Sequence, residues 1–230
     1  MMKVDLRHNP SFTVARCVLA GGEKMRAESG AMLAHSAGVT FEAKVEGGMM
    51  AGLKRSVLGG ESLFQTTFTA PGPGGWVDVA ANLPGDAITI DLGPGQDRFL
   101  LTKGCWLANS AGVAIDTKWG GARNLFGGEG GFLVEASGQG VVVASCFGAL
   151  DVIDLDAGEQ VVIDTGHVVA YAPTIAFQIR RAVAGRSIQS MKSGEGFVFD
   201  FTGPGRVLLQ SRNPSQMISY LTANMPGSRA

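Results

Sequence analysis

The chain of 230 residues has few charged side chains, few cysteines and no long apolar run. Asp, Glu, Lys and Arg make up 17% of the residues, below the ~25% that is usual in soluble domains. The formal net charge of -1 gives no excess charge that would attract nucleic acid or an anionic lipid surface. Because apolar residues still make up 45%, we expect part of the apolar area to form an interface between subunits.

The cysteine and hydropathy patterns exclude a disulfide-rich or membrane-spanning protein. Cys17, Cys105 and Cys146 show no paired spacing, and the sequence begins with no signal-like segment. These features predict reduced thiols and a cytoplasmic location. The longest apolar stretch, Val141 to Leu150, is about half as long as a membrane-spanning helix requires, so we expect no transmembrane segment.

Glycine is abundant, with 34 residues, and it marks an internal repeat. Three marks recur in one order: Gly30, Gly104 and Gly166; then the Gly-Glu pairs 60–61, 128–129 and 194–195; then the turns 72–74, 138–140 and 203–205. A fixed order of marks at a constant period is typical of repeat architectures. The sequence predicts a single compact domain, 1–230, built of three β repeats at approximately 1–95, 96–160 and 161–221, with an internal pseudo-threefold repeat.

Short runs of β-forming residues between Gly and Pro predict an all-β protein. The clearest runs are 64–69, 76–79, 88–92, 132–135 and 197–201. We expect a strand pair to open each repeat, a Gly-rich connection to cross over, and a hairpin at the 72–74, 138–140 or 203–205 turn to close it. Two further turns, at 83–86 and 155–159, are expected between repeats, and residues 1–27 are expected to add edge strands.

A short helix is predicted only near the C-terminus. Asn213 can cap it, Pro214 suits its first turn, and Met217, Ile218 and Leu221 form an apolar stripe.

Two segments approximate catalytic motifs without the required context. Ala34-His35-Ser36-Ala37-Gly38 is close to the esterase nucleophile elbow, but Ala108-Asn109-Ser110-Ala111-Gly112 repeats it. An elbow needs a strand, a tight turn and then a helix, whereas strand-like residues follow both copies. We therefore interpret both as repeated turns.

The glycine-rich segment 47–56 resembles a phosphate-binding loop, but Leu53 occupies the position of the lysine. A phosphate loop needs that lysine and a following helix. A connection between strands is the simpler interpretation. Its basic residues, Lys54 and Arg55, together with Arg123 at the corresponding place of the second repeat, are the only weak binding candidates.

The sequence contains no convergent set of metal ligands or acid–base groups. His8, His35 and His167 occupy different offsets within the repeats, so the repeat does not bring them together, and a metal centre needs converging ligands. The glutamates of the three Gly-Glu pairs belong to separate repeats, and turn carboxylates commonly accept backbone N–H bonds. We expect no metal, no cofactor and no catalytic residue.

Taken together, these marks resemble the family named for altered inheritance of mitochondria, formerly a domain of unknown function. The residues that carry the likeness are 28–33, 52–55, 60–64, 127–130 and 212–215, and it extends over roughly 28–221. The resemblance implies the fold of the tryptophan-sensing RNA-binding attenuation protein (TRAP): three fused TRAP-like β-sandwich units of double-stranded β-helix type. It also implies trimeric rings. No functional residue of that protein is recognisable here.

The sequence favours a non-enzymatic, oligomeric scaffold or binding protein, because no nucleophile, base and oxyanion site are arranged together. The partners expected are other copies of the chain, as a homotrimer, and an unknown protein or small molecule; nucleic acid is not expected. Two alternatives stay open. One is binding of a small ligand or nucleic acid in clefts between β units, by analogy with the fold. The other is an enzyme whose site is assembled across subunits.

Overall fold

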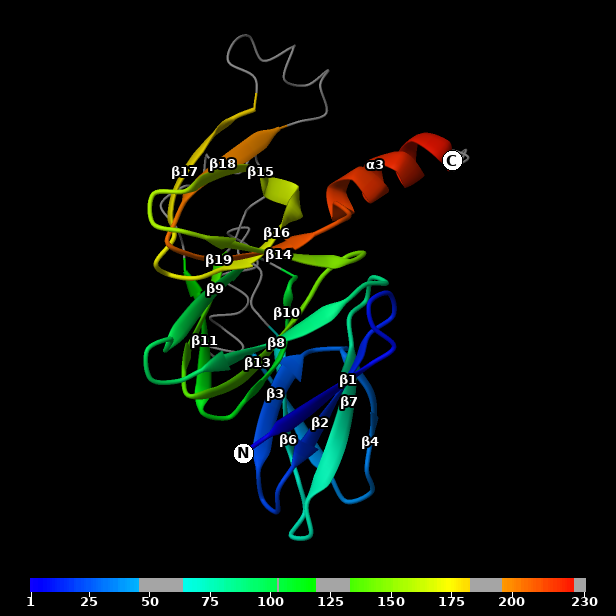
Figure 1. Ribbon diagram of the computed structural model, residues 1–230. Helices are drawn as coiled ribbons and strands as arrows, with labels where there is room; N and C mark the ends of the chain where they lie inside the picture. The colour runs from blue at the N-terminus through cyan, green and yellow to red at the C-terminus, as the bar shows by residue number, and fades with distance from the viewer. Residues whose placement is uncertain (46–63, 103, 119–132, 183–195, 226–230) are drawn as a thin grey trace.

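The computed structural model describes residues 1–45, 64–102, 104–118, 133–182 and 196–225 (Figure 1). This part of the chain contains nineteen β-strands, one short 3-10 turn and one α-helix at the C-terminal end. The expected all-β class with a short C-terminal helix is confirmed.

The strands form three units with the same strand order, preceded by one additional strand, β1 (Lys3–Arg7). The first unit contains β2 (Val14–Leu19), β3 (Lys24–Glu28), β4 (Met32–His35), β5 (Thr40–Val45), β6 (Phe64–Thr69) and β7 (Gly75–Ala80). The second contains β8 (Ala87–Leu92), β9 (Arg98–Thr102), β10 (Trp106–Ser110), β11 (Val113–Lys118), β12 (Leu133–Gly138) and β13 (Gly140–Ser145). The third contains β14 (Leu150–Leu155), β15 (Gln160–Asp164), the 3-10 turn η1 (Thr165–His167), β16 (Val168–Tyr171), β17 (Ala176–Arg181), β18 (Phe197–Thr202) and β19 (Gly205–Gln210).

Each unit is a sandwich of two three-stranded halves, and neighbouring units share a sheet. The first, sixth and third strands of a unit form one half, and the fourth, fifth and second form the other. The second strand of one unit then pairs with the third strand of the next, β3 with β10 and β9 with β16. The sheets are β1-β2-β7-β4 (sheet 1), β5-β6-β3-β10-β13-β8 (sheet 2), β11-β12-β9-β16-β19-β14 (sheet 3) and β15-β18-β17 (sheet 4).

This pairing divides the chain at other places than the expected repeats. The units run from 14–80, 87–145 and 150–210, whereas the expected limits fall after residue 95, between β8 and β9, and at residue 160, at the start of β15. A sequence repeat fixes the period, but hydrogen bonding decides where a unit begins. For the same reason, the turn at 83–86 does connect two units, but the turn at 155–159 lies inside the third.

The expected closing hairpins are wrong, because their turns connect different sheets. The turns at 72–74 and 203–204 lie between β6 and β7 and between β18 and β19, and Gln139 separates β12 from β13. The two strands at each turn belong to opposite halves of the sandwich. The strands that do pair as neighbours are the fourth and fifth of each unit, for example β5 with β6. The strands on either side of a turn instead contribute apolar residues to the same core from opposite halves, as Phe68 of β6 and Val77 of β7 do in one cluster.

The N-terminal segment was expected to add edge strands, and only β1 does so, because β2 and β3 are paired on both sides.

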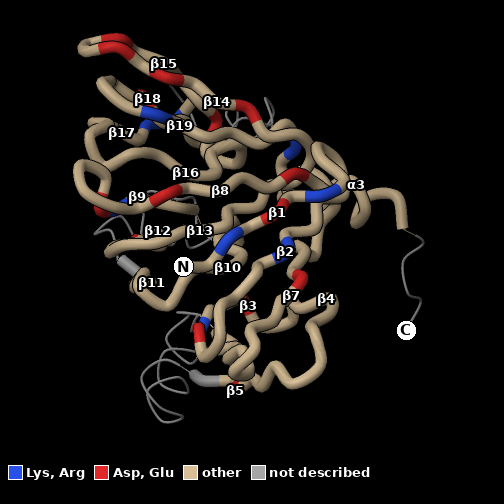
Figure 2. Tube along the Cα trace, turned by 60° about the horizontal axis from the view of Figure 1, so that its bottom comes forward, with Lys and Arg blue, Asp and Glu red and all other residues tan. Residues whose placement is uncertain are grey.

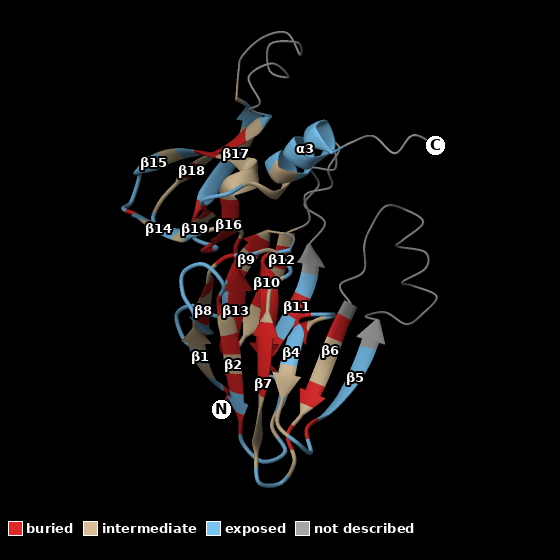
Figure 3. Cartoon of the chain, turned by 90° about the vertical axis from the view of Figure 1, so that its right-hand side faces the viewer, coloured by how far each residue is buried: buried red, intermediate tan, exposed pale blue. Residues whose placement is uncertain are grey.

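Buried apolar side chains form two clusters that cross the boundaries between units. The first fills the first unit but includes Leu107, Val141 and Val143 of the second unit. The other fills the second and third units together. Strands β10 and β13 are therefore buried on both faces, as the red colour along them in Figure 3 shows. The units cannot be separated without exposing this core.

The segments that connect the units bond to one another in a ladder. The Thr13 amide donates to the Gly85 carbonyl, the Asp86 amide to the Gly148 carbonyl, and the Ser211 amide to the Ala149 carbonyl, at 3.0, 2.9 and 2.9 Å. Glycine is required at position 85 because a Cβ there would collide with the Cys146 carbonyl. The ladder fixes the spacing of the units at one end of the strands.

The C-terminal helix α3 (Pro214–Asn224) forms as the sequence predicts. The Asn213 side chain caps it by accepting from the Ser215 amide at 2.9 Å, and Pro214 lies in the first turn. None of its residues is buried, and it stands away from the sheets in Figure 1. Its apolar Ile218 and Leu221 are therefore exposed.

A charged cluster covers the outer face of sheet 1. The Asp78 carboxylate, 5% exposed, accepts from Arg16 Nε at 2.8 Å and from Arg7 Nη2 at 2.7 Å. The Arg16 guanidinium also lies 3.9 Å from the centre of the Trp76 ring, a cation–π contact. Hydrogen bonds from Arg16 hold the pKa of Asp78 below its ordinary value.

We predict that Asp78→Ala lowers the free energy of unfolding at pH 7 by ~1–3 kcal/mol, the usual cost of losing a buried, charged hydrogen-bond partner. Because folding depresses the pKa of Asp78, its contribution is complete above the unfolded pKa of about 4 and is lost as the pH falls through the lower native value. Urea denaturation at pH 7 and in acid should show the two proteins converging. Asp154→Ala, which removes a largely exposed pair with Arg206, is the control and should cost less than ~1 kcal/mol.

Candidate functional site

The first unit and the last unit each contain one strand that lacks the neighbour which its equivalents have at the boundaries between units. Strand β4 lies at one end of sheet 1, opposite β1, and β15 lies at one end of sheet 4, opposite β17. They are the third strand of the first unit and the second strand of the third unit. Inside the chain, strands in these two positions pair with each other.

Exposure of equivalent residues shows what β4 lacks. The third strand of each unit begins two residues after a glycine, which is Gly30, Gly104 or Gly166. The three strands can therefore be aligned residue by residue from these glycines. Leu33 in β4 is 61% exposed, whereas its equivalents Leu107 and Val169 are 1% and 0% exposed. Strand β4 therefore has the apolar pattern of β10 and β16, but it lacks the second strand of a preceding unit with which those strands pair.

Strand β15 shows the complementary deficiency. Val162 is 56% exposed, and its equivalents Arg26 and Leu100 lie opposite Asn109 and Tyr171 of the following unit. An unpaired strand edge of this kind attracts other strands. The two edges, β4 with Leu33 and β15 with Val162, form the candidate site, which we name the open edges.

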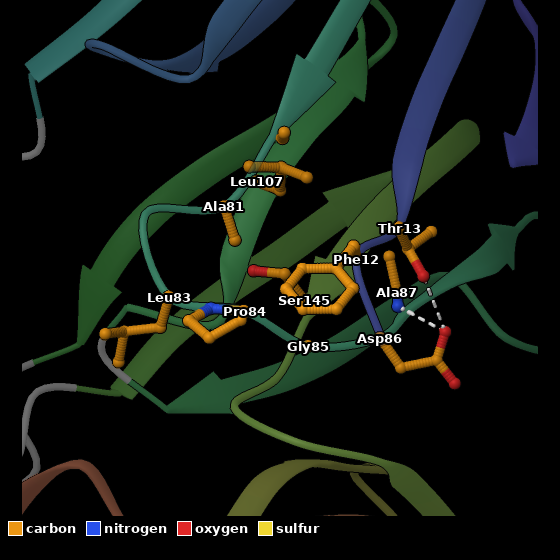
Figure 4. Close-up of a pocket in the computed structure, with 11 residues that line it drawn as sticks. Phe12, Thr13, Ala81, Leu83, Pro84, Gly85, Asp86, Ala87, Leu107 and Ser145 are labelled. Atoms are coloured by element: carbon orange, nitrogen blue, oxygen red, sulfur yellow. Dashed lines mark hydrogen bonds between the residues drawn. The ribbon is translucent and has the colours of Figure 1, made fainter. Parts of the chain in front are cut away.

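A small pocket lies at the seam between the first and second units (Figure 4). It has a volume of about 120 Å³ and is bordered by Phe12, Pro84 and Leu107. Its one carboxylate, Asp86, accepts from the Thr13 hydroxyl at 3.0 Å and from the Ala87 amide at 2.8 Å. Ligand pockets usually measure ~300–1,000 Å³, so this pocket is too small for such a ligand, and Asp86 instead attaches the N-terminal segment.

The two serines of the elbow-like segments make the same backbone contact in two units. Ser36 Oγ accepts from the Trp76 amide and Ser110 Oγ from the Val141 amide, both at 3.0 Å. Strands β5 and β11 follow them, so the strand expected in place of an elbow helix is confirmed.

We predict that Ser110→Ala lowers the free energy of unfolding by ~1–3 kcal/mol, because it leaves the buried Val141 N–H without its acceptor. Ser36→Ala is the matched control and should cost less, since its contact is only partly buried. Thermal unfolding checks both values. Neither serine should react with a fluorophosphonate probe, and labelling of either one would contradict the structural role.

The other chemistry-bearing side chains of the described residues are not gathered together. His35 Nδ1 lies 3.0 Å from the Ser36 carbonyl and His167 Nδ1 lies 2.7 Å from the Gln210 carbonyl. All three cysteines are free and buried, and burial raises the pKa of Cys105 and of Cys146 to about 11, which disfavours the reactive thiolate. No group of three or more potential metal ligands occurs among the described residues.

The binding candidates from the sequence, Lys54, Arg55 and Arg123, lie outside the described residues, as do all three Gly-Glu pairs. Positions of Lys and Arg and positions of Asp and Glu are both scattered along the described part of the chain (Figure 2). Sequence reasoning missed Leu33 and Val162. Aligning the first glycine marks places Leu33 with the apolar Leu107 and Val169, but it does not show which of the three lacks a neighbouring strand.

No helix in the described part of the chain has the length and apolar character needed to cross a membrane.

Comparison with known proteins identifies a family, and the proteins that the chain resembles include two from Streptococcus pyogenes. The family described as mitochondrial biogenesis AIM24 matches residues 4–212. An uncharacterised protein of Streptococcus pyogenes serotype M6 is 32% identical over 236 residues, covering 99% of this chain and 92% of that protein. A crystal structure of a protein from Streptococcus pyogenes superposes with a TM-score of 0.81 at 28% identity, covering 98% of this chain and all of the other.

Proposed function

The chain belongs to the mitochondrial biogenesis AIM24 family, and on that premise we propose that it is a non-enzymatic scaffold or binding protein that assembles through its open edges. The observation that carries this proposal is the exposure of Leu33 at a position where both equivalents are buried. Burial of a second copy's edge strand against β4 completes the arrangement that the chain already uses twice.

The internal boundaries specify how two copies would pair. Ala108 lies opposite Ala27, and Ala170 lies opposite Leu101, in antiparallel strands. The equivalent residues at the open edges are Ala34 and Ile163. The neighbouring pair is then His35 opposite Val162, since Asn109 lies opposite Arg26 and Tyr171 opposite Leu100.

Head-to-tail pairing of this kind either closes into a ring or continues as a filament. We propose a ring of three chains, hence nine units, which is the assembly that the family resemblance implies. A closed ring removes every open edge of this type. The cytoplasmic location stays a prediction from the cysteine pattern.

Within the described residues, the absence of enzymatic activity is supported by how the reactive groups are used. Ser36, Ser110, His35 and His167 all bond to backbone groups. A catalytic set needs a nucleophile, a base and an oxyanion site within hydrogen-bonding reach of one another.

We expect Leu33→Lys to break the assembly, because it places a charge where both equivalents, Leu107 and Val169, are buried. Sedimentation should give the mass of one 23.9 kDa chain for this variant and about three times that mass for the unchanged protein. Val152→Lys, which introduces a lysine at a 39% exposed residue of β14, should leave the larger mass intact. A single-chain mass for the unchanged protein at micromolar concentration would rule out the ring.

The proposed register has its own test. Residues directly opposite in antiparallel strands have Cα atoms about 4.5–5.5 Å apart, within the range that a disulfide bridges. Oxidation of the His35→Cys/Val162→Cys double variant should therefore give covalent multimers on a non-reducing gel. The His35→Cys/Val152→Cys variant is the control and should stay unlinked. If both variants cross-link equally, the register is wrong even if the mass is that of a trimer.

A further inference from the structure

Strand β1 covers the outer edge of β2, whereas the corresponding edges of β8 and β14, the first strands of the other two units, have no added strand in the described part of the chain. It pairs antiparallel with β2, the first strand of the first unit, over all five of its residues. The equivalent first strands, β8 and β14, each lie at one end of sheets 2 and 3, respectively. In the described part of the chain, each of them is therefore paired on one side only.

At the first seam, β1 closes the space between sheets 1 and 2 with alternate side chains. Val4 and Leu6 pack against the first apolar cluster, and they lie opposite Cys17 and Ala15 of β2. Arg7, on the other face of the strand, bonds to Asp78 at 2.7 Å. The strand thus combines backbone pairing, two aliphatic contacts and a basic residue that meets a carboxylate.

At the second seam, the corresponding space is a cleft of about 500 Å³ between β8 on one side and β14 and β19 on the other. This volume falls in the range of binding sites. Its floor includes Ile88 and Ile90 of β8, and carboxylates of Asp91 and Asp154 border it. Asp154 bonds to Arg206, whereas Asp91 is an exposed residue on the edge strand itself.

We propose that this cleft binds an extended peptide segment of a partner protein, which adds to the edge of β8 as β1 adds to β2. Peptides that add a strand to an open edge gain affinity from main-chain hydrogen bonds and specificity from alternate side chains. The chain itself contains the template for the geometry. This inference does not depend on the ring, because β8 is distant in sheet order from both open edges.

The register of β1 gives the chemistry of the peptide. The first strand of each unit pairs with the sixth strand of the same unit. This pairing begins with Val14 opposite Ala80 in the first unit and with Ala87 opposite Ser145 in the second, so Val14 of β2 corresponds to Ala87 of β8. Lys3 lies opposite Val18, and the equivalent of Val18 in β8 is Asp91.

A peptide in this register therefore places its first residue opposite Asp91, its second opposite Ile90 and its fourth opposite Ile88. Opposite charges and apolar pairs are favourable across strands. The preferred pattern is basic, aliphatic, polar, aliphatic, which is also the pattern of Lys3-Val4-Asp5-Leu6.

The probe is a dye-labelled synthetic peptide with the sequence of residues 2–8, added to the full-length protein and followed by fluorescence anisotropy. We expect saturable binding, and protection of β8 from hydrogen exchange. A peptide of the same composition in which the aliphatic residues no longer alternate should bind at least about tenfold more weakly, since its apolar side chains cannot all face the cleft. Equal binding of the two peptides, or binding of neither, would overturn the proposal.

Two matched charge reversals locate the site. Asp91→Lys should weaken binding of the probe about fivefold or more, because a like charge then lies opposite its lysine. Asp151→Lys makes the same change on β14 outside the cleft and should have no effect. If Asp151→Lys weakened binding and Asp91→Lys did not, the peptide would bind at β14 and the proposed site at β8 would be wrong. The Leu33→Lys variant should bind the probe as the unchanged protein does, so failure of the ring and failure of the peptide site are told apart.

Discussion

Backbone pairing between the second strand of one unit and the third strand of the next is the interaction on which the rest of the structure depends. The β3–β10 and β9–β16 pairs join half-sheets of different units, and the shared sheets then let apolar clusters extend across each boundary. Buried backbone groups need partners, so a chain built in this way leaves one unmatched strand at each end. The open edges are a consequence of the repeat itself.

The first unit is adapted to its place at the end of the series. At the position where the second and third units carry the buried Val143 and Leu208, it carries Asp78, neutralised by Arg7 and Arg16. An apolar side chain there would leave an exposed patch on the free chain, with a risk of non-specific association. The ion pair keeps this face compatible with water, while the nearby Leu33 remains available to a matching edge. Selectivity between partners commonly combines attractive and unfavourable groups in this manner.

Local sequence signals predicted the elements well and their connections poorly. The run 64–69 coincides with β6, and Asn213 with Pro214 starts α3 as predicted, because alternation, turn residues and caps act over a few residues. The sheet assignment of strands on either side of the 72–74 turn depends on distant partners, so a hairpin and a crossover look alike in sequence. The candidate site was missed for a related reason. Leu33 and the buried Leu107 occupy equivalent apolar positions, and Leu33 is exposed only because β4 has no neighbouring strand on that side.

Three units of one design become different sites because their boundaries are filled differently. The first seam is closed by β1, the second keeps a cleft of about 500 Å³ beside β8, and the third boundary is the place where another copy would join. The backbone edges are alike at each first strand, but the side chains are not: Val18 of β2 corresponds to Asp91 of β8 and Asp154 of β14. A carboxylate on the unpaired edge of β8 would disfavour indiscriminate strand addition and would favour a strand that brings a basic residue. If the units bind different strands, the residues that differ between units would set the specificity, while the residues that recur in every unit maintain the fold.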